Sequence, residues 1–353
     1  LDYATALQIA GEHKKSNEYF LKAEQLVDQL DYVSVSNVAL ATLGSEDQLQ
    51  YKGDSYEKVL IPVMMSLNFL MLGDFESALV AVRRVNERVN KIRQTSRQNY
   101  ELNPFAHQLS ALIWESQAQF DNAYIAAEKA YELGARNDLL QKDLVRLARK
   151  ARRPEAEKKW KELFGLDLAS EELDRKKGDL IFIHQQGWGP RKDFSPDGHQ
   201  FPILVPARGQ TQSLVIKIKH PQGYESQHQP APVYDLEEEA IRNFRDDYAG
   251  LVARRIAARV AKEVVADQIR QRDEVAGSLA WIAMYLSDRA DLRQWSFLPQ
   301  SFQILRLRLP PGTYQLEGEA LSSSGLPTNE TLPLREISIR AGATEIFSWR
   351  SLK

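Results

Sequence analysis

Cysteine is absent from the 353 residues of the chain. Its absence excludes disulfide bonds, thiol nucleophiles and zinc sites built on cysteine. No run of about 18 or more uncharged apolar residues occurs either, so we expect no transmembrane helix. The formal net charge is only −2, which gives the chain no overall attraction for nucleic acid or acidic membranes. With 43% hydrophobic and 27% charged residues, the composition is that of a globular protein long enough for two domains.

The chain also lacks an initiator methionine. It begins at Leu1, and no signal peptide follows. We therefore expect a processed or trimmed form of the gene product. The lack of cysteine is compatible with the cytoplasm, and equally with a periplasmic protein that has no disulfides. A lipoprotein cut just after its lipidated cysteine would show the same features.

Motifs of common catalytic and cofactor sites are missing as well. The chain contains no H-E-x-x-H, no Walker A motif, no G-x-S-x-G and no dinucleotide fingerprint. None of its six histidines pair at positions i and i+4. His220 and His228 share one loop, where two metal ligands could meet, but a solvated loop explains them more simply. We expect no metal, no cofactor and no catalytic residues.

What the first half does contain is helical periodicity. Residues 56–90 predict two helices joined by a tight turn at 72–75, because apolar residues recur there at intervals of three and four. Gly73 can take the positive φ that ends the first helix, and Asp74 can cap the second. A helical hairpin of this kind cannot bury its apolar face alone, so it needs neighbouring hairpins.

The hairpins resemble one another. The turn QFDNA at 119–123 has the form of DFESA at 74–78, and the small residues Ala123 and Ala156 are 33 positions apart, close to the tetratricopeptide period of about 34. Ala78 and Ala123 are 45 apart, so an insertion separates them. We predict an all-α, tetratricopeptide-like helical-repeat domain over residues 1–165. A non-repeat helical bundle would use the same periodicity and stays open.

The second half changes to the alternation of strands. Residues 178–353 predict a β-rich domain, an antiparallel sheet or sandwich with inserted helices, and the whole chain is therefore of the α+β class. A long helix is expected at 235–272 and a short apolar one at 277–286. The expected strands are 179–184, 201–205, 213–219, 302–309, 313–320, 334–339 and 344–349.

Three blocks carry a resemblance to a known family. LNFLMLGDFESALVAVRR (67–84), GDLIFIHQQGWGPRK (178–192) and ADLRQWSFLPQSFQILRLRLPPGTY (290–314) resemble a family of uncharacterised bacterial envelope lipoproteins with a tetratricopeptide-like N-terminal half. The resemblance implies secretion to the periplasm and an outer-membrane lipid anchor, on a cysteine that this chain lacks. It carries over no activity, since the family has none established.

We expect a non-enzymatic envelope scaffold or adaptor that binds a partner protein in a helical-repeat groove. Stacked hairpins form a concave surface, and their first helices usually line it. The residues that we expect to line it are Asn68, Gln108, Glu115 and Arg146. The partner itself cannot be named from the sequence, nucleic acid is not expected, and membrane contact would come only through the anchor.

A second candidate surface is the loop with Trp188, Arg191 and Lys192, which could dock a partner or a cell-wall glycan. The simpler interpretation is that Trp188 packs on a sheet. Asp291 and Arg293 similarly predict an internal salt bridge, and Trp295 a core anchor.

Alternative functions remain. The chain could be an assembly factor of an envelope surface machine or a glycan-binding module centred on its tryptophans. It could also cleave a glycan with two carboxylates about 5–10 Å apart in a cleft.

Overall fold

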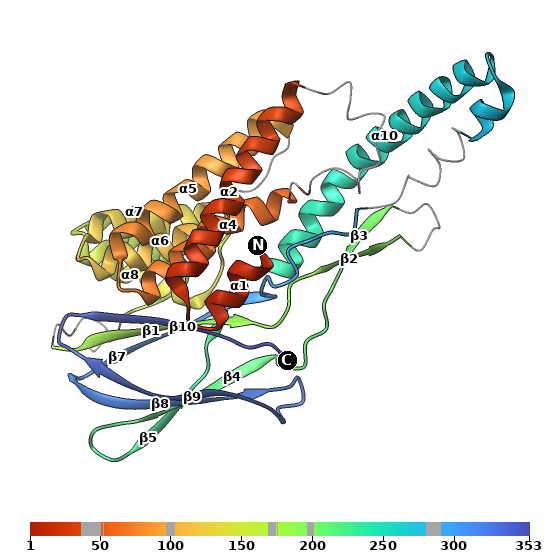
Figure 1. Ribbon diagram of the computed structural model, residues 1–353. Coiled ribbons are helices and arrows are strands. Elements are labelled where there is room, and N and C mark those ends of the chain that lie inside the picture. Colours follow the sequence, from red (N-terminus) through yellow and green to blue (C-terminus); the bar gives the residue numbers. More distant parts are fainter. Residues whose placement is uncertain are drawn as a thin grey trace.

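The computed structural model describes residues 1–36, 51, 53–96, 103–168, 174, 176–195, 201–279 and 291–353. Within them, helices fill the first half of the chain and strands dominate the second, as expected for an α+β protein. Three layers result (Figure 1). The helices cover one face of a four-stranded sheet, and a second four-stranded sheet covers the other face.

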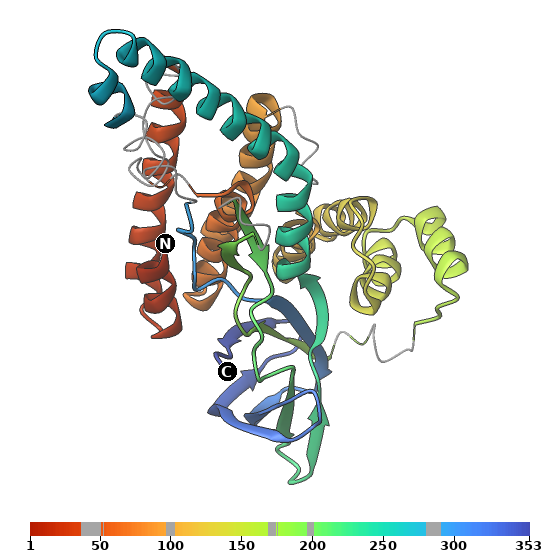
Figure 2. The ribbon, with the colours of Figure 1, turned by 90° about the vertical axis from the view of Figure 1, so that its right-hand side faces the viewer.

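The helical layer is a row of neighbouring helices that runs from α9 at one end to α1 and α2 at the other (Figure 2). Each helix packs against the helix that follows it among the described residues. The helices of this layer are α1 (Asp2–Ile9), α2 (His13–Ser36), α4 (Ser55–Met71), α5 (Phe75–Ser96), α6 (Pro104–Ser116), α7 (Phe120–Glu132), α8 (Asp138–Lys150) and α9 (Pro154–Phe164).

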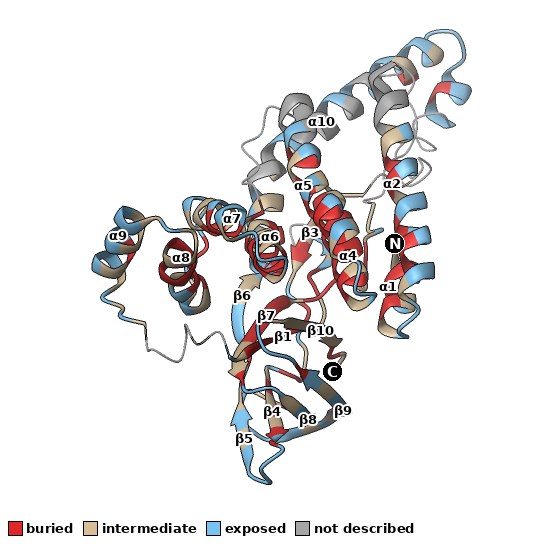
Figure 3. Cartoon of the chain, turned by 90° about the vertical axis from the view of Figure 1, so that its left-hand side faces the viewer, coloured by how far each residue is buried: buried red, intermediate tan, exposed pale blue. Residues whose placement is uncertain are grey.

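The predicted hairpin at 56–90 is present as α4 and α5. Gly73 has a φ of +72°, and the Asp74 carboxylate accepts a hydrogen bond of 3.0 Å from the backbone N–H of Ser77, which caps α5. Helix α4 is buried over most of its length and lies between α2 and α5 (Figure 3). The hairpin therefore provides much of the core against which its neighbours pack.

The first sheet has the strand order β10-β1-β7-β6, and the second has the order β5-β4-β8-β9. The first contains β1 (Gly178–Gln186), β6 (Ala231–Asp235), β7 (Ser301–Leu309) and β10 (Thr344–Arg350). The second contains β4 (Ser213–Lys219), β5 (Glu225–His228), β8 (Gly312–Leu321) and β9 (Pro327–Ile339). A separate ribbon pairs β2 (Arg191–Phe194) with β3 (Pro202–Val205).

The central strand β1 is buried on both faces. Ile181 and Ile183 pack toward the helices, while Leu180 and Phe182 pack toward the second sheet. A strand covered on both faces has no polar side to alternate with, which explains the continuous apolar run LIFI. β1 pairs antiparallel with β7 but parallel with β10, so the first sheet is mixed. The sequence pattern predicted antiparallel pairing and did not predict the parallel pair.

The long helix α10 spans Leu236–Arg270, within the predicted range of 235–272. Asp235 caps its start by accepting a hydrogen bond of 2.8 Å from Glu238 N–H. The helix begins beside β3 and β7 and then extends away from the rest of the molecule (Figures 1 and 2). The short helix expected at 277–286 lies mostly outside the described residues.

One core joins the helices to the first sheet. Phe105 of α6 stacks on Phe302 of β7 with ring centroids 4.3 Å apart, and Phe20 of α2 contacts Trp295 at 5.6 Å. The change from helix to strand falls between the end of α9 at Phe164 and the start of β1 at Gly178. The two halves therefore share a hydrophobic core, although their secondary structure differs.

Candidate functional site

A buried ionic cluster connects the helical layer to the first sheet, and it consists of Glu115, Asp143, Arg146, Asp179 and Arg306. The Arg306 guanidinium of β7 lies 2.8 Å from Glu115, 3.0 Å from Asp143 and 3.2 Å from Asp179. Arg146 of α8 contacts Glu115 at 2.8 Å and also bonds Asp143. All five side chains are buried. The cluster therefore fixes how the helices sit on the sheet.

Glu115 of this cluster is unsuited to acid catalysis. Burial by itself would raise the pKa of Glu115, but Arg146 and Arg306 outweigh burial and hold that pKa well below its usual range. Glu115 and Asp179 line the same cavity of ≈540 Å³. Because Glu115 is ion-paired to Arg146 and Arg306 and a general acid needs a raised pKa, this carboxylate does not favour glycan cleavage.

The expectation of an open groove lined by Asn68, Gln108, Glu115 and Arg146 requires correction. All four side chains are buried. Glu115 and Arg146 are buried because Arg306, from strand β7, forms an ion pair with Glu115, and Glu115 in turn pairs with Arg146.

The other two residues predicted to line the groove, Asn68 and Gln108, form hydrogen bonds with neighbouring helices. The Asn68 amide donates hydrogen bonds of 2.8 Å to both Ser16 and Asn17 of α2, and its oxygen accepts one from Gln8. Gln108 exchanges hydrogen bonds of 3.0 and 3.2 Å with Asn137 at the start of α8. Buried polar side chains with such partners hold helices in register and leave nothing for a ligand.

The loop with Trp188, Arg191 and Lys192 packs on the molecule. The Trp188 indole N–H donates to the carbonyl of Leu352, and its ring meets Phe297 edge-on at 5.2 Å. Lys192 forms an ion pair of 2.8 Å with Asp54, and its side chain is only 5% exposed. Of the three residues, Arg191 alone is exposed. The simpler interpretation, a tryptophan packed against the protein, therefore fits these contacts.

The segment with Asp291, Arg293 and Trp295 forms the predicted salt bridge and core anchor. Arg293 and Asp291 are 2.8 Å apart. Trp295 is 2% exposed, its indole N–H donates to Thr5 at 2.8 Å, and its backbone N–H donates to the Glu57 carboxylate at 2.6 Å. This segment therefore attaches the second half of the chain to α1 and α4.

Histidines do not assemble a metal centre in the described part of the chain, where no group of three or more metal-ligating side chains occurs. The Nε2 atoms of His220 and His228 lie 2.9 and 3.0 Å from one hydroxyl, that of Ser226. His184 is buried between Gln303 and Ser351, and burial lowers its pKa to about 4. These side chains act as hydrogen-bonding groups of the sheets.

One side of the two-sheet stack is open. β9 and β10 are edge strands of different sheets, and the turn 340–343 connects them. β9 pairs with β8 and β10 pairs with β1, so the two strands are not paired with each other. A cavity of ≈440 Å³ lies between them, lined by Arg335, Glu336, Ile337, Ser338, Arg340, Glu345, Ile346 and Phe347. We call this cavity the edge cleft. Charged, polar and apolar side chains of β9 and β10 all contribute to its lining.

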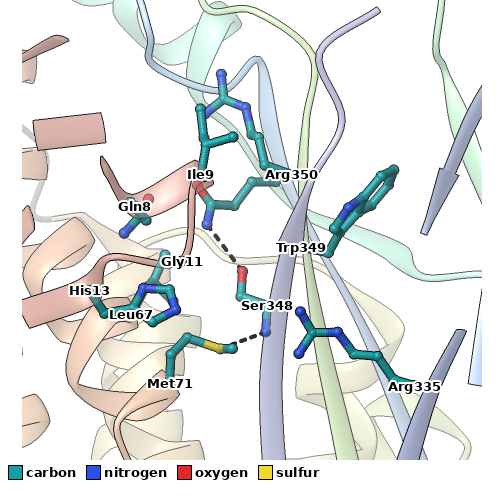
Figure 4. Close-up of a pocket in the computed structure, with 11 residues that line it drawn as sticks. Gln8, Ile9, Gly11, His13, Leu67, Met71, Arg335, Ser348, Trp349 and Arg350 are labelled. Carbon is teal, nitrogen blue, oxygen red and sulfur yellow. Dashed lines mark hydrogen bonds between the residues drawn. The ribbon is translucent and has the colours of Figure 1, made fainter. Parts of the chain in front are cut away.

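A smaller cavity of ≈120 Å³ lies where α1, α2 and α4 meet β10 (Figure 4). Its lining consists of Gln8, Ile9, Gly11, His13, Leu67, Met71, Gln185, Arg335, Ser348, Trp349 and Arg350. We call it the arginine pocket, because two arginines and a histidine line it. Arg335 also lines the edge cleft, so the two cavities are neighbours.

Sequence reasoning missed both cavities. A strand signal at 344–349 is present, but nothing local shows that β10 pairs, within the described part of the chain, with a strand on one side only. Arg350 directly follows the predicted strand and resembles an exposed strand end, yet it is 6% exposed. Arg350 is buried where it donates hydrogen bonds to the carbonyls of Gly187 and Leu298, two residues that are far from it in the sequence.

Comparison of the chain with protein-family models, with curated protein sequences and with solved structures gives no match in any of the three. Among the residues that the structure describes, no helix combines the length and the apolar character needed to cross a membrane.

Proposed function

We propose that this chain is a non-enzymatic cell-envelope scaffold that binds an extended segment of a partner protein in the edge cleft. The observation that supports this proposal is the position of β9 and β10. Within the residue ranges described above, each pairs with a strand on one side only, and together they flank one cavity. Edge strands of this kind are the usual acceptors of an added peptide strand.

The hydrogen bonds of β10 favour an extended backbone as the ligand. The backbone N–H of Ser348 donates to the sulfur of Met71 at 3.0 Å, on the side away from β1. A thioether is a weak acceptor, so this donor would gain from a peptide carbonyl. Because alternate residues of a strand share one direction, the N–H groups of Thr344 and Ile346 point the same way. β10 would thus offer a row of donors to a partner strand.

Side chains of the cleft would select the partner. Ile337 and Ile346 supply half-buried apolar surface, and Arg340 and Glu345 form a largely exposed ion pair at 3.7 Å. In strand addition, main-chain hydrogen bonds supply affinity and such pockets supply specificity.

The helical layer has a different part in this proposal from the one expected of an open repeat groove. We take it to be a tetratricopeptide-like array whose inner face is occupied by the first sheet of the same chain. The array would then brace the sheets and hold β10 in place through Met71.

The envelope location belongs to the proposal through the resemblance of the three sequence blocks. The full-length protein should carry a lipid and fractionate with outer membranes. Metabolic labelling with a fatty acid, combined with membrane fractionation of the native host, tests this. An unlabelled protein in the cytoplasmic fraction contradicts it.

The docking surface is tested by placing a photoreactive amino acid at Glu336 in the edge cleft of the full-length protein. Crosslinking in cells of the native host should capture one recurrent partner, and mass spectrometry should locate the crosslink in a single short segment. The same amino acid at Glu317, an exposed position on β8, is the matched control and should not capture that segment.

A peptide with the captured sequence then separates strand addition from simple proximity. Its binding should slow hydrogen exchange at the backbone N–H groups of Thr344, Ile346 and Ser348, because they become hydrogen-bonded. Equal capture from Glu317, or unchanged exchange at these three groups, contradicts the proposal.

A further inference from the structure

The arginine pocket has the chemistry of an anion site. Its lining contains the basic side chains His13, Arg335 and Arg350, and no aspartate or glutamate is among the described residues that line it. A small cavity with basic walls and restricted access to water concentrates positive potential. An anion is therefore the ligand that this cavity fits best.

Arg350 is the most unusual group of this lining. Its side chain is 6% exposed, and one nitrogen, Nη2, donates to the carbonyls of Gly187 and Leu298 at 2.7 and 2.8 Å. Its Nε and Nη1 have no hydrogen-bond partner among the described residues. Burial lowers the pKa of Arg350 to about 9, and only the more distant Glu330 opposes that shift. A buried cation with two open donors is stabilised by an anion placed beside it.

The other two basic groups lie near the free edge of β10. In Figure 4, Arg335 extends from β9 toward Ser348, and His13 lies on the other side of the Met71–Ser348 contact. His13 is bound through Nδ1 to Asn68 at 3.1 Å, which orients its ring. The N–H of Ser348, with its weak sulfur acceptor, faces the same space.

The pocket also contains open acceptors, and these select among anions. The amide nitrogen of Gln8 donates a hydrogen bond of 2.8 Å to Asn68, and that of Gln185 donates one of 3.1 Å to Ser348. Their Oε1 atoms are buried without a partner among the described residues. A bare inorganic anion would leave these two oxygens unpaired, which is costly in a buried site. A peptide C-terminus offers a carboxylate together with backbone N–H donors, so it satisfies both kinds of open group.

We infer that the arginine pocket binds the C-terminal carboxylate of the extended segment that docks in the edge cleft. This inference rests on the proposed function, and it adds that the docked segment of the partner is its C-terminus, with a free carboxylate. The cavities are neighbours through Arg335, and the cleft runs along Glu345–Phe347 of β10 before the pocket begins at Ser348. The segment therefore runs parallel to β10 and ends at the pocket.

Peptide titration tests this inference with the intact chain. The probes are N-acetyl-Thr-Val-Thr-Val-Ala with a free carboxylate, the same peptide as its C-terminal amide, and acetate. Chemical-shift changes measure binding at ligand concentrations up to about 10 mM, a range that detects millimolar affinity. The acid should bind saturably, and the amide and acetate at least about tenfold more weakly.

Variants locate the site. Arg335→Gln should weaken binding of the acid by about tenfold, a loss of about 1.4 kcal/mol, while leaving the amide unchanged. Arg335 is exposed, so the variant should fold normally. His13→Gln is a second variant at the half-exposed end of the pocket. Arg272→Gln, an exposed arginine just beyond α10, is the charge-matched control and should bind like the wild type.

The outcomes separate this inference from the proposed function. Equal binding of acid and amide, unaffected by Arg335→Gln, overturns the carboxylate site but leaves edge docking intact. Selective binding of the acid, with no partner captured from Glu336, supports the pocket and contradicts the proposed scaffold function. Acetate binding as tightly as the peptide shows a general anion site, and absence of any saturable binding overturns the inference outright.

Discussion

Glu57 shows how a single residue can couple the stability of this fold to pH. Its carboxylate accepts hydrogen bonds from the backbone of Trp295 and Asp54 and from the hydroxyl of Tyr51. Burial nevertheless raises its pKa to about 7, the negative charge of Asp54 adds to the rise, and the hydrogen bonds only partly oppose it. Glu57 therefore gains a proton near neutral pH at the point where α4 meets the segment with Trp295.

Changing Glu57 to glutamine should remove this pH dependence. The folded pKa lies above the ordinary value of 4.5, so the stabilisation by the bound proton is complete below pH 4.5 and is lost as the pH rises through about 7. Between pH 5 and pH 8, as a rough window, the wild type should lose about 3 kcal/mol of unfolding free energy more than Glu57→Gln. Urea unfolding at both pH values measures the difference.

His184 is an internal reference for that experiment. Its pKa is lowered to about 4, so its contribution is present above 6.5 and is lost as the pH falls through about 4, the opposite sign to Glu57. His184 is common to both proteins, so it cancels in the comparison. If the wild type and Glu57→Gln change in parallel between the two pH values, the assignment to Glu57 is wrong.

Arg306 is the residue on which the ionic cluster depends. Replacing it with methionine leaves Glu115 and Asp179 buried without their shared cation. Removing one partner from a buried ionic network costs about 3–5 kcal/mol, and we expect that loss in the unfolding free energy of Arg306→Met, measured by chemical denaturation. Arg340→Met, at a side chain that is 77% exposed, should change it by less than about 0.5 kcal/mol. A loss below about 1 kcal/mol for Arg306→Met would show that the cluster contributes little.

Helix α10 has two parts with different packing. Leu236 at its start is 1% exposed, whereas Val260 and Val264 farther along are more than half exposed. Leu236→Ala should destabilise the protein by about 2–5 kcal/mol because it opens a cavity in the shared core. Val260→Ala should change stability by less than about 0.5 kcal/mol. Thermal unfolding of the two variants makes the comparison, and a large loss for Val260→Ala would mean that this face of α10 is covered.

The elements that could be predicted from the sequence are those with a local signal. The strand at 213–219 coincides with β4, because one of its faces is buried and its side chains alternate. β5 and β6 are missing from the predicted strands, because both are short edge strands with exposed residues. β2, whose residues are mostly exposed, overlaps the predicted loop for the same reason.

Residues of the candidate site were harder to predict than the elements. Trp295 was expected in the core because large aromatic residues are usually buried. Asn68, Glu115 and Arg146 were expected on an open surface because the first helices of stacked hairpins usually line the groove, yet the sheet and neighbouring helices satisfy them internally. Which polar residues become buried depends on contacts between distant segments, and no local pattern encodes those contacts.

At the scale of the whole molecule, the shared core predicts cooperative unfolding. Ile181 and Phe302 of the first sheet belong to the same buried cluster as Met64 and Phe105 of the helices. We expect far-UV circular dichroism, which follows the helices, and tryptophan fluorescence, which follows the tertiary packing of both halves, to give one coincident transition in denaturant. Two separate midpoints would show that the halves are independent folding units.

The place of β1 at the centre of the first sheet has a consequence for the time course of folding. His184 of β1 pairs with Gln303, 119 residues later, and with Ser351, 167 residues later. At about 5–20 residues per second, a ribosome needs roughly ten seconds to supply either neighbour of this strand. During that interval the run LIFI has apolar side chains on both faces and no strand beside it. The nascent chain is therefore a natural client for a holding chaperone, and closure of such distant pairs should make the sheet form after the helices.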